Sequence, residues 1–235
     1  MKGLFVTGTD TDAGKTVVTA ALAASLRGRG FPVQAAKPLA TGEAAPGSDA
    51  LRIAAAAGHA PLNLVCLPEP ASPDRAAREA GTTVDLDATL DWLRSLGTPL
   101  LVEGVGGWEV PLGRGQSVAD LGRRLGFPVL IVAPNRLGVL NHVHLTVNAV
   151  RARGLWVAGV VLNDGVERAA PEPLASWNAE DLRNADIDVV RLGVVPERGL
   201  ALEGSRLIAA LPGVAAALLD DDEATTTPPM GDGAR

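Results

Sequence analysis

Cysteine, aromatic residues and long apolar runs are scarce in this chain of 235 residues, and each shortage excludes a class of protein. The single cysteine, Cys66, excludes an internal disulfide and disfavours a zinc site built on cysteines, which suits a reducing cytoplasm. No apolar run approaches the ~20 residues that span a bilayer, and the chain starts directly with a strand pattern instead of a signal peptide. The net charge of −6 and the short basic clusters argue against a nucleic-acid surface. We therefore expect a cytoplasmic protein that binds neither nucleic acid nor a membrane.

Lysine is scarce as well. Lys2, Lys15 and Lys37 are the only lysines among 21 basic residues, and the others are arginine. Base-composition bias explains such a replacement, so random retention of the two internal lysines is one alternative. A compact ammonium that can lose its proton supports chemistry that a permanently charged arginine does not. Because Lys15 lies inside the motif described below, we predict that Lys15 and Lys37 are functional.

Apolar segments alternate between strand and helix patterns over residues 1–219, and 47% of the residues are hydrophobic, which suits one globular domain. We predict strands at about 4–6, 33–37, 98–103, 128–133, 155–162 and 188–194, and helices at 17–29, 49–57, 74–80, 86–96, 118–125, 142–153, 180–185, 200–211 and 214–219. This alternation is typical of an α/β fold with three layers, in which helices flank a mostly parallel central sheet. Residues 220–235 are acidic and poor in large apolar groups, so we expect a disordered tail.

The segment from Thr7 to Thr16 has the glycines and the Gly-Lys-Thr ending of a phosphate-binding loop, and it lies between the first strand and the first helix. Main-chain N–H groups at a helix start and the helix dipole both favour a phosphate there. Lys15 can reach the β- and γ-phosphates, and the Thr16 hydroxyl can ligate Mg²⁺. Five residues separate Gly8 from Gly14, one more than usual, which leaves an ordinary strand-to-helix turn as the alternative. The context predicts a P-loop NTPase fold.

Two charged side chains stand at strand ends, where ligands bind in a parallel sheet. Lys37 ends the second predicted strand, and Glu103 ends the third, just before the glycine-rich stretch 104–107 that carries Trp108 after it. Glu103 can hold Mg²⁺ near the phosphate loop, or it can be a surface acid. The glycines favour close approach of a bulky group, so Trp108 is the tryptophan that we place near a ligand.

Two other residues have two interpretations each. Asn163 follows a strand and can be a turn residue, or its amide can recognise an adenine edge through one donor and one acceptor. Asp49 follows Ser48, a predicted N-cap. On the residues alone, complementing the helix dipole is the favoured role for Asp49 and ligating Mg²⁺ is the alternative.

Four segments together resemble the dethiobiotin synthetase family of the biotin pathway: residues 8–16, 37–38, 102–108 and 137–142. The similarity runs in order from residue 3 to about residue 205, and that family has the same five-residue spacing in its loop. The resemblance implies an ATP- and Mg²⁺-dependent cyclo-ligase. The enzyme would join CO₂ to 7,8-diaminopelargonic acid through a carbamate and a carbamic–phosphoric anhydride, and it would release dethiobiotin, ADP and phosphate. It also implies a homodimer with the substrate site at the subunit interface.

The same resemblance assigns roles to residues. Lys37 and Lys15 would be catalytic, and Mg²⁺ would be held by Thr16, Asp49 and Glu103, which reverses the preference for a dipole role of Asp49. The nucleotide would contact Asp12, Ala13, Gly14, Lys15, Thr16, Val17, Asp49, Glu103, Gly104, Val105, Gly106, Asn163, Asp164, Pro196 and Glu203. The substrate would contact Thr11, Lys37, Thr41 and, from the partner subunit, Gly138, Val139, Leu140 and Asn141.

The resemblance has departures and rivals. Asp74 stands where the family often has histidine, and the 41–49 loop is short, so the fine substrate contacts stay open. A partitioning-type P-loop ATPase, acting as a nucleotide switch, is the first alternative, but it carries a signature lysine where this chain has Asp10 and uses an amphipathic membrane-binding tail. A cobyrinate-type amide ligase is the second, but it needs a glutamine-hydrolysing domain with a nucleophilic cysteine, and Cys66 lies in a Pro-rich connection.

Overall fold

The computed structural model describes residues 2–219, so the tail predicted for 220–235 lies outside the described residues. Within that range, a six-stranded sheet has the order β10-β9-β8-β1-β5-β2, and every adjacent pair is parallel. Its strands are β1 (Gly3–Gly8), β2 (Gln34–Ala36), β5 (Leu100–Gly107), β8 (Val129–Pro134), β9 (Val157–Asn163) and β10 (Val189–Leu192). The predicted parallel sheet is confirmed.

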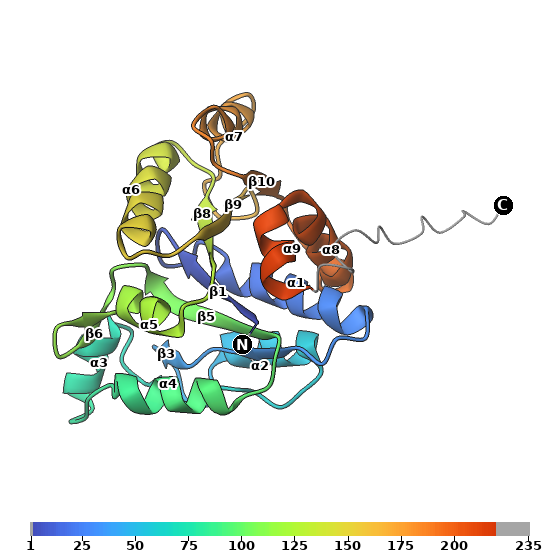
Figure 1. Ribbon diagram of the computed structural model, residues 1–235. Coiled ribbons are helices and arrows are strands. Elements are labelled where there is room, and N and C mark those ends of the chain that lie inside the picture. Colours follow the sequence, from blue (N-terminus) through green and yellow to red (C-terminus); the bar gives the residue numbers. More distant parts are fainter. Residues whose placement is uncertain (1, 220–235) are drawn as a thin grey trace.

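Helices cover both faces of this sheet (Figure 1). One face packs against α1 (Lys15–Gly28), α2 (Ser48–Ala57), α8 (Leu200–Ala210) and α9 (Pro212–Leu218). The other packs against α3 (Pro73–Glu79), α4 (Leu86–Ser95), α5 (Val118–Leu125), α6 (Val139–Ala152) and α7 (Leu174–Asn184). Successive strand residues point to opposite faces, so Leu4 and Val6 join the first core and Phe5 joins the second. The three-layer prediction is therefore confirmed.

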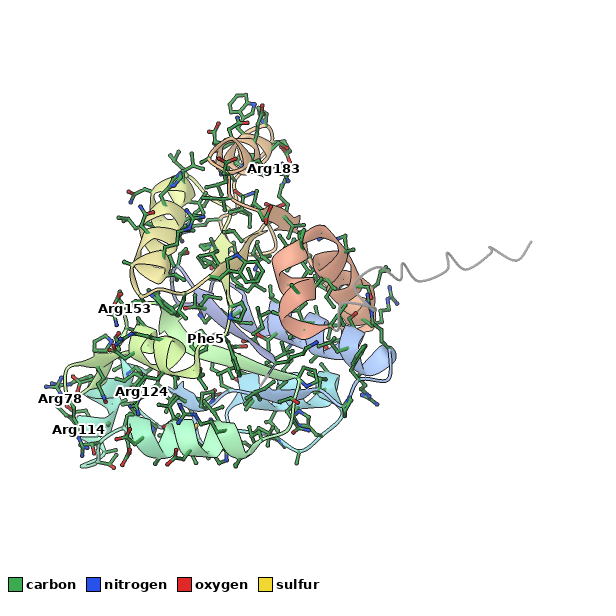
Figure 2. All side chains as sticks on the ribbon, in the orientation of Figure 1. Phe5, Arg78, Arg114, Arg124, Arg153 and Arg183 are labelled. Atoms are coloured by element: carbon green, nitrogen blue, oxygen red, sulfur yellow. The ribbon has the colours of Figure 1, made fainter. Side chains whose placement is uncertain are left out.

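Both faces of the central strands are buried, which explains their unbroken apolar runs. All six residues of β1 and all six of β8 are buried. In Figure 2, Phe5 lies near the middle of the molecule, whereas the labelled arginines Arg78, Arg114, Arg124 and Arg183 lie toward its rim and are exposed. Lys15 and Lys37, in contrast, are buried. The contrast between surface arginine and internal lysine supports a special role for these two lysines.

Several predicted boundaries were wrong, mostly where tertiary pairing extends an element. A small parallel pair, β3 (Leu39–Thr41) with β4 (Val65–Leu67), lies outside the six predicted strands, and β4 is part of the Pro-rich connection that holds Cys66. β5 continues through its glycines as far as Gly107, which pairs with Gly8 of β1. A hairpin of β6 (Pro111–Gly113) and β7 (Gln116–Ser117) follows it.

Two helices begin earlier than predicted. α6 begins at Val139 and not at residue 142, and α7 begins at Leu174 and not at residue 180. α8 is preceded by a short 3-10 helix, η1 (Glu197–Gly199). Among residues 2–219 no single helix is long and apolar enough to cross a membrane; one pair, Glu197–Ala210 with Pro212–Leu218, reaches that length and composition only across a 107° bend.

Candidate active site

The phosphate loop connects β1 to α1 at the carboxyl edge of the sheet, as predicted. Gly14 is the N-cap of α1 with φ of 95°, a left-handed conformation that favours glycine. A Cβ on Gly8 would lie 2.7 Å from the carbonyl oxygen of Asp10, so this glycine lets the loop fold tightly over the strand end. Both glycines therefore have a steric reason, and the first-turn N–H groups of α1 face the place where an anion would sit.

Lys15 is a buried cation at the end of this loop. Its side chain is 6% exposed, and its Nζ donates a hydrogen bond to the carbonyl oxygen of Asp10 over 3.2 Å. Burial, together with the neighbouring Lys37 charge, lowers the pKa of Lys15 below 10.5. A bound polyanion would stabilise the charged ammonium of Lys15 and so counteract both effects. The Lys15 charge in this loop therefore suits a phosphate group.

Lys37 follows β2 and lies against two carboxylates from different elements. Its Nζ donates to Asp49 Oδ2 at 3.0 Å, to Glu103 Oε1 at 2.5 Å and to the Gly104 carbonyl oxygen at 3.2 Å. Burial alone would lower the pKa of Lys37, but the carboxylates of Glu103 and Asp49 outweigh it and raise this pKa above 10.5. Lys37 is therefore held in its charged form.

Asp49 lies in the first turn of α2, which is the position that a dipole role requires. Its carboxylate also reaches Lys37, so the structure places Asp49 in the same cluster as the lysine. Burial works to raise the pKa of Asp49, but Lys37 and the Thr16 hydroxyl outweigh it and hold this pKa below 3.8. The predicted N-cap was wrong by one residue: Gly47 is the N-cap, and the Ser48 N–H donates to the carboxylate of Glu43 at 2.8 Å.

The oxygen donors of Thr16, Asp49 and Glu103 fit a hard divalent cation. The Thr16 hydroxyl donates to Glu103 Oε1 at 3.0 Å, while Glu103 Oε2 is buried without a hydrogen-bond partner among the described residues. A buried carboxylate oxygen without a partner is costly unless a ligand satisfies it. No group of three or more His, Cys, Asp or Glu side chains converges within residues 2–219, so Mg²⁺ here would complete its shell with the hydroxyl, phosphate oxygens and water.

Lys15, Thr16, Lys37 and Asp49 line one cavity of about 370 Å³, whereas Glu103 is fully buried and is not part of its lining. Of the predicted site residues this cavity brings together Thr11, Asp12, Gly14, Lys15, Thr16, Val17, Lys37, Thr41, Asp49, Val105 and Gly106. Sequence analysis missed three lining residues, Ala40, Glu43 and Arg52. Arg52 comes three residues after Asp49 on α2, so helical spacing was the available signal. Its Nη2 pairs with Glu197 Oε1 of η1 at 2.7 Å.

Four residues that were predicted to contact the nucleotide, Asn163, Asp164, Pro196 and Glu203, lie outside that lining. Asn163 ends β9 beneath the loop, where Nδ2 donates to the Ala13 carbonyl oxygen at 3.0 Å. Asp164 accepts from Asn135 Nδ2 at 2.6 Å and from Arg191 Nε at 2.8 Å. Pro196 precedes η1, and Glu203 on α8 pairs with Arg206 at 2.7 Å. The adenine contact of Asn163 and the nucleotide contacts of the other three residues stay predictions.

The sequence analysis predicted a loop at 138–141, and the structure corrects this prediction. Gly138, with φ of 92°, is the N-cap of α6, and Val139, Leu140 and Asn141 form its first turn. The sequence analysis placed the start of this helix too late, because Gly138 has no side chain that could mark an N-cap and an apolar run precedes the polar residues. None of these residues lines the cavity around Lys15. Their contact with the substrate from a partner subunit stays a prediction.

A second cavity of about 420 Å³ lies beside the first and shares Thr11 with it. Trp108 lines it, and its indole is also part of the core, so its place near a ligand stays a prediction. Its ring meets Phe5 edge-on with centroids 6.0 Å apart, and only 3% of it is exposed. Asp74, the departure noted above, forms a surface ion pair with Arg78 at 3.0 Å.

Comparison with known proteins adds independent evidence. A family model described as an AAA domain matches residues 2–201. The ATP-dependent dethiobiotin synthetase BioD of Anaeromyxobacter sp. (strain Fw109-5) is 45% identical, with 77% of this chain and 84% of that protein aligned. The enzymes of the same name from Aromatoleum aromaticum and Ralstonia nicotianae are 42% and 40% identical; the alignments cover 82% and 91% of this chain, and 89% and 96% of those proteins.

Among solved structures, the septum site-determining protein MinD complexed with Mg-ADP from Pyrococcus horikoshii OT3 aligns over 92% of each chain with a TM-score of 0.45 and 21% identity. The three synthetase alignments each span more than two thirds of both proteins. The parallel sheet, the phosphate loop and the two buried lysines agree with these alignments. The chain therefore belongs to the dethiobiotin synthetase family and is an ATP-dependent ligase of the biotin pathway with a P-loop NTPase fold.

Proposed function

We propose that this protein uses ATP and Mg²⁺ to carboxylate 7,8-diaminopelargonic acid with CO₂ and to close its cyclic urea. The observation that carries the proposal is that Lys15, Thr16, Lys37 and Asp49 line one cavity at the end of β1, with the buried Glu103 hydrogen-bonded to Lys37 and Thr16. Phosphoryl transfer depends on positioning and charge neutralisation more than on covalent catalysis. Two ammonium groups and a cluster of oxygen ligands supply both.

The reaction divides into three steps. One amine of the substrate attacks CO₂ and loses a proton to give a carbamate. A carbamate oxygen then attacks the γ-phosphorus of ATP, and ADP leaves, which forms a carbamic–phosphoric anhydride. The second amine attacks the carbamoyl carbon, and inorganic phosphate leaves as the ring closes. Each bond formed is matched by one that breaks, so no oxidant or further reactant is needed.

The residues divide this work among them. The N–H groups of Asp12–Val17 bind the phosphates, and Lys15 neutralises charge on the β- and γ-phosphates. Lys37, held in its charged form, binds the carbamate and the transferring phosphoryl group. Mg²⁺, held by Thr16, Asp49 and Glu103, would neutralise further charge on the triphosphate. Thr11 and Thr41 line the cavity where the amines would lie.

A homodimer would complete the substrate site. The first turn of α6 offers N–H groups without a side-chain cap, a site suited to the substrate carboxylate. Leu137 and Leu145, beside and on this helix, are 83% and 61% exposed, which suits burial against a second copy. Sedimentation equilibrium should therefore give twice the 24.0 kDa chain mass; a monomer that is fully active would refute the shared site.

The test of the activity is direct. Purified protein is mixed with Mg-ATP, bicarbonate and 7,8-diaminopelargonic acid, and mass spectrometry looks for the cyclic urea, with ¹³C-bicarbonate placing the label in the new carbonyl. Lys15→Met serves as the control and should give no product. Diamine-independent ATP hydrolysis without a cyclic urea would overturn the proposal and favour the nucleotide-switch alternative.

A further inference from the structure

Asn163 makes two directed hydrogen bonds that use both ends of its carboxamide. Nδ2 donates to the carbonyl oxygen of Ala13, inside the phosphate loop, at 3.0 Å, and Oδ1 accepts from the Gly165 N–H at 2.9 Å. The side chain is nearly buried, with 5% of the residue exposed. Because a carbonyl oxygen only accepts and an N–H only donates, the two partners fix which end of the amide is nitrogen.

The amide also fills the space that a side chain at Gly14 would need. A Cβ on Gly14 would lie 2.0 Å from Asn163 Nδ2, far inside van der Waals contact. The left-handed φ of 95° already favours glycine at this position. The phosphate loop and Asn163 are therefore fitted to one another at the residue that caps α1.

The strand end that carries Asn163 is itself anchored. The main-chain carbonyl of Asn163 accepts from the N–H of Asn135 at 2.9 Å, and the N–H of Asp164 donates to the Leu192 carbonyl oxygen at 2.7 Å. The Asp164 carboxylate is held by Asn135 Nδ2 and by Arg191 Nε. Arg191 in turn pairs with Glu172 at 2.6 Å. A side chain projecting from this network is a fixed support.

We infer that Asn163 is a positioning residue for the phosphate loop: its carboxamide holds the Ala13–Gly14 peptide so that the N–H groups after it point at the triphosphate. The inference rests on the proposed ATP-binding site and goes beyond an adenine contact. An amide that only recognised the base would influence ligands that carry a base. An amide that holds the loop influences the binding of any polyphosphate.

The test compares Mg-ATP with Mg-tripolyphosphate, which has the phosphates and no base, by calorimetric titration of the full-length protein. Asn163→Asp replaces the donor to Ala13 with an oxygen, and Asn163→Ala removes both hydrogen bonds without adding a charge. Loss of one hydrogen bond to a buried carbonyl is worth about a tenfold change in affinity. We expect both variants to weaken both ligands by about that factor or more.

The matched control is Thr89→Val. Thr89 on α4 is another buried polar side chain, and its hydroxyl donates to the Asp85 carbonyl oxygen at 2.7 Å, outside the network that supports Asn163. Circular dichroism and thermal melts confirm that each variant is folded, and we expect Thr89→Val to keep wild-type affinity for tripolyphosphate.

Three results separate the ideas. Equal loss for ATP and tripolyphosphate in the Asn163 variants, with Thr89→Val unchanged, supports the inference. Loss for ATP alone overturns it and leaves a base contact, and unchanged affinity for both ligands overturns it as well. A wild-type protein that binds neither ligand would instead contradict the proposed function.

Discussion

Replacement of Lys37 by methionine, which keeps the length of the side chain, removes the charge that two carboxylates share. Glu103 is completely buried and, among residues 2–219, would keep only the Thr16 hydroxyl as a hydrogen-bond partner. Breaking a buried ion pair by removing one partner costs about 3–5 kcal/mol, while the Asp49 side chain is 41% exposed and adds little. We therefore expect Lys37→Met to lower the free energy of unfolding by about 3 kcal/mol.

Such a loss is measurable without unfolding the protein at 25 °C, because domains have about 5–15 kcal/mol of stability. For a chain of this size it corresponds to a fall in Tm of about 6–12 °C. Urea unfolding of the ligand-free protein gives the free energy, and the double variant Lys37→Met/Glu103→Gln is the matched control. Removing both charges should recover part of the loss, because no unpaired charge then stays buried.

The pH dependence has a defined sign. The pKa of Lys37 is raised, so its contribution is complete below 10.5 and disappears as the pH rises through the folded-state pKa, above 10.5. The pKa of Asp49 is lowered, so its contribution is present above 3.8 and disappears as the pH falls through its lower folded-state pKa. The difference between wild type and Lys37→Met should therefore persist between these limits and shrink outside them.

The reasoning is refuted if Lys37→Met unfolds within about 1 kcal/mol of wild type at neutral pH and the double variant is no more stable. Ligase activity is a separate readout. Turnover should be lost in Lys37→Met at 25 °C, where circular dichroism still shows a folded protein, and Mg-ATP should still bind. Retained turnover would remove Lys37 from the catalytic machinery.

Three other changes test the same site. The pKa of Lys15 is lowered in the ligand-free protein and a bound anion favours the charged amine, so calorimetric affinity for Mg-tripolyphosphate should begin to fall at a pH below 10.5; constant affinity up to pH 10.5 would contradict this. Gly14→Ala places a Cβ 2.0 Å from Asn163 Nδ2 at a φ of 95°. Urea unfolding should therefore show a free energy of unfolding lower by about 1–3 kcal/mol, and ADP should bind more weakly. Wild-type behaviour in both assays would show that the loop adapts. Arg52 lines the cavity, so Arg52→Gln should weaken ATP binding more at low salt than at high salt. Glu197→Gln removes only the ion-pair partner of Arg52 and should not weaken ATP binding. Equal losses of affinity in the two variants would assign the effect to the ion pair.

Local sequence determined the phosphate loop and its surroundings. A strand, two glycines at fixed spacing and a Gly-Lys-Thr helix start are short-range features, and the loop geometry follows from the φ angles that glycine permits. The alternation of apolar strands with amphipathic helices determined the parallel sheet and its two helical layers, because each element must bury its apolar face against a neighbour. α5 (Val118–Leu125) was predicted to the residue because a capping box, Ser117 with Asp120, and a left-handed Gly126 mark its ends locally.

Tertiary structure alone decided which distant side chains share one site. The sequence placed Lys37 and Glu103 at strand ends, but only the strand order puts β2 next to β5 and brings the two side chains within 2.5 Å. The residues alone favoured a dipole role for Asp49, and the packing of α2 also brings its carboxylate to Lys37. The support that Asn163 gives to Ala13 spans 150 residues of sequence and was not visible from either segment. Local patterns report φ angles and burial, whereas ion pairs and hydrogen bonds between elements depend on strand order and on the packing of helices across the sheet, which no short stretch of sequence contains.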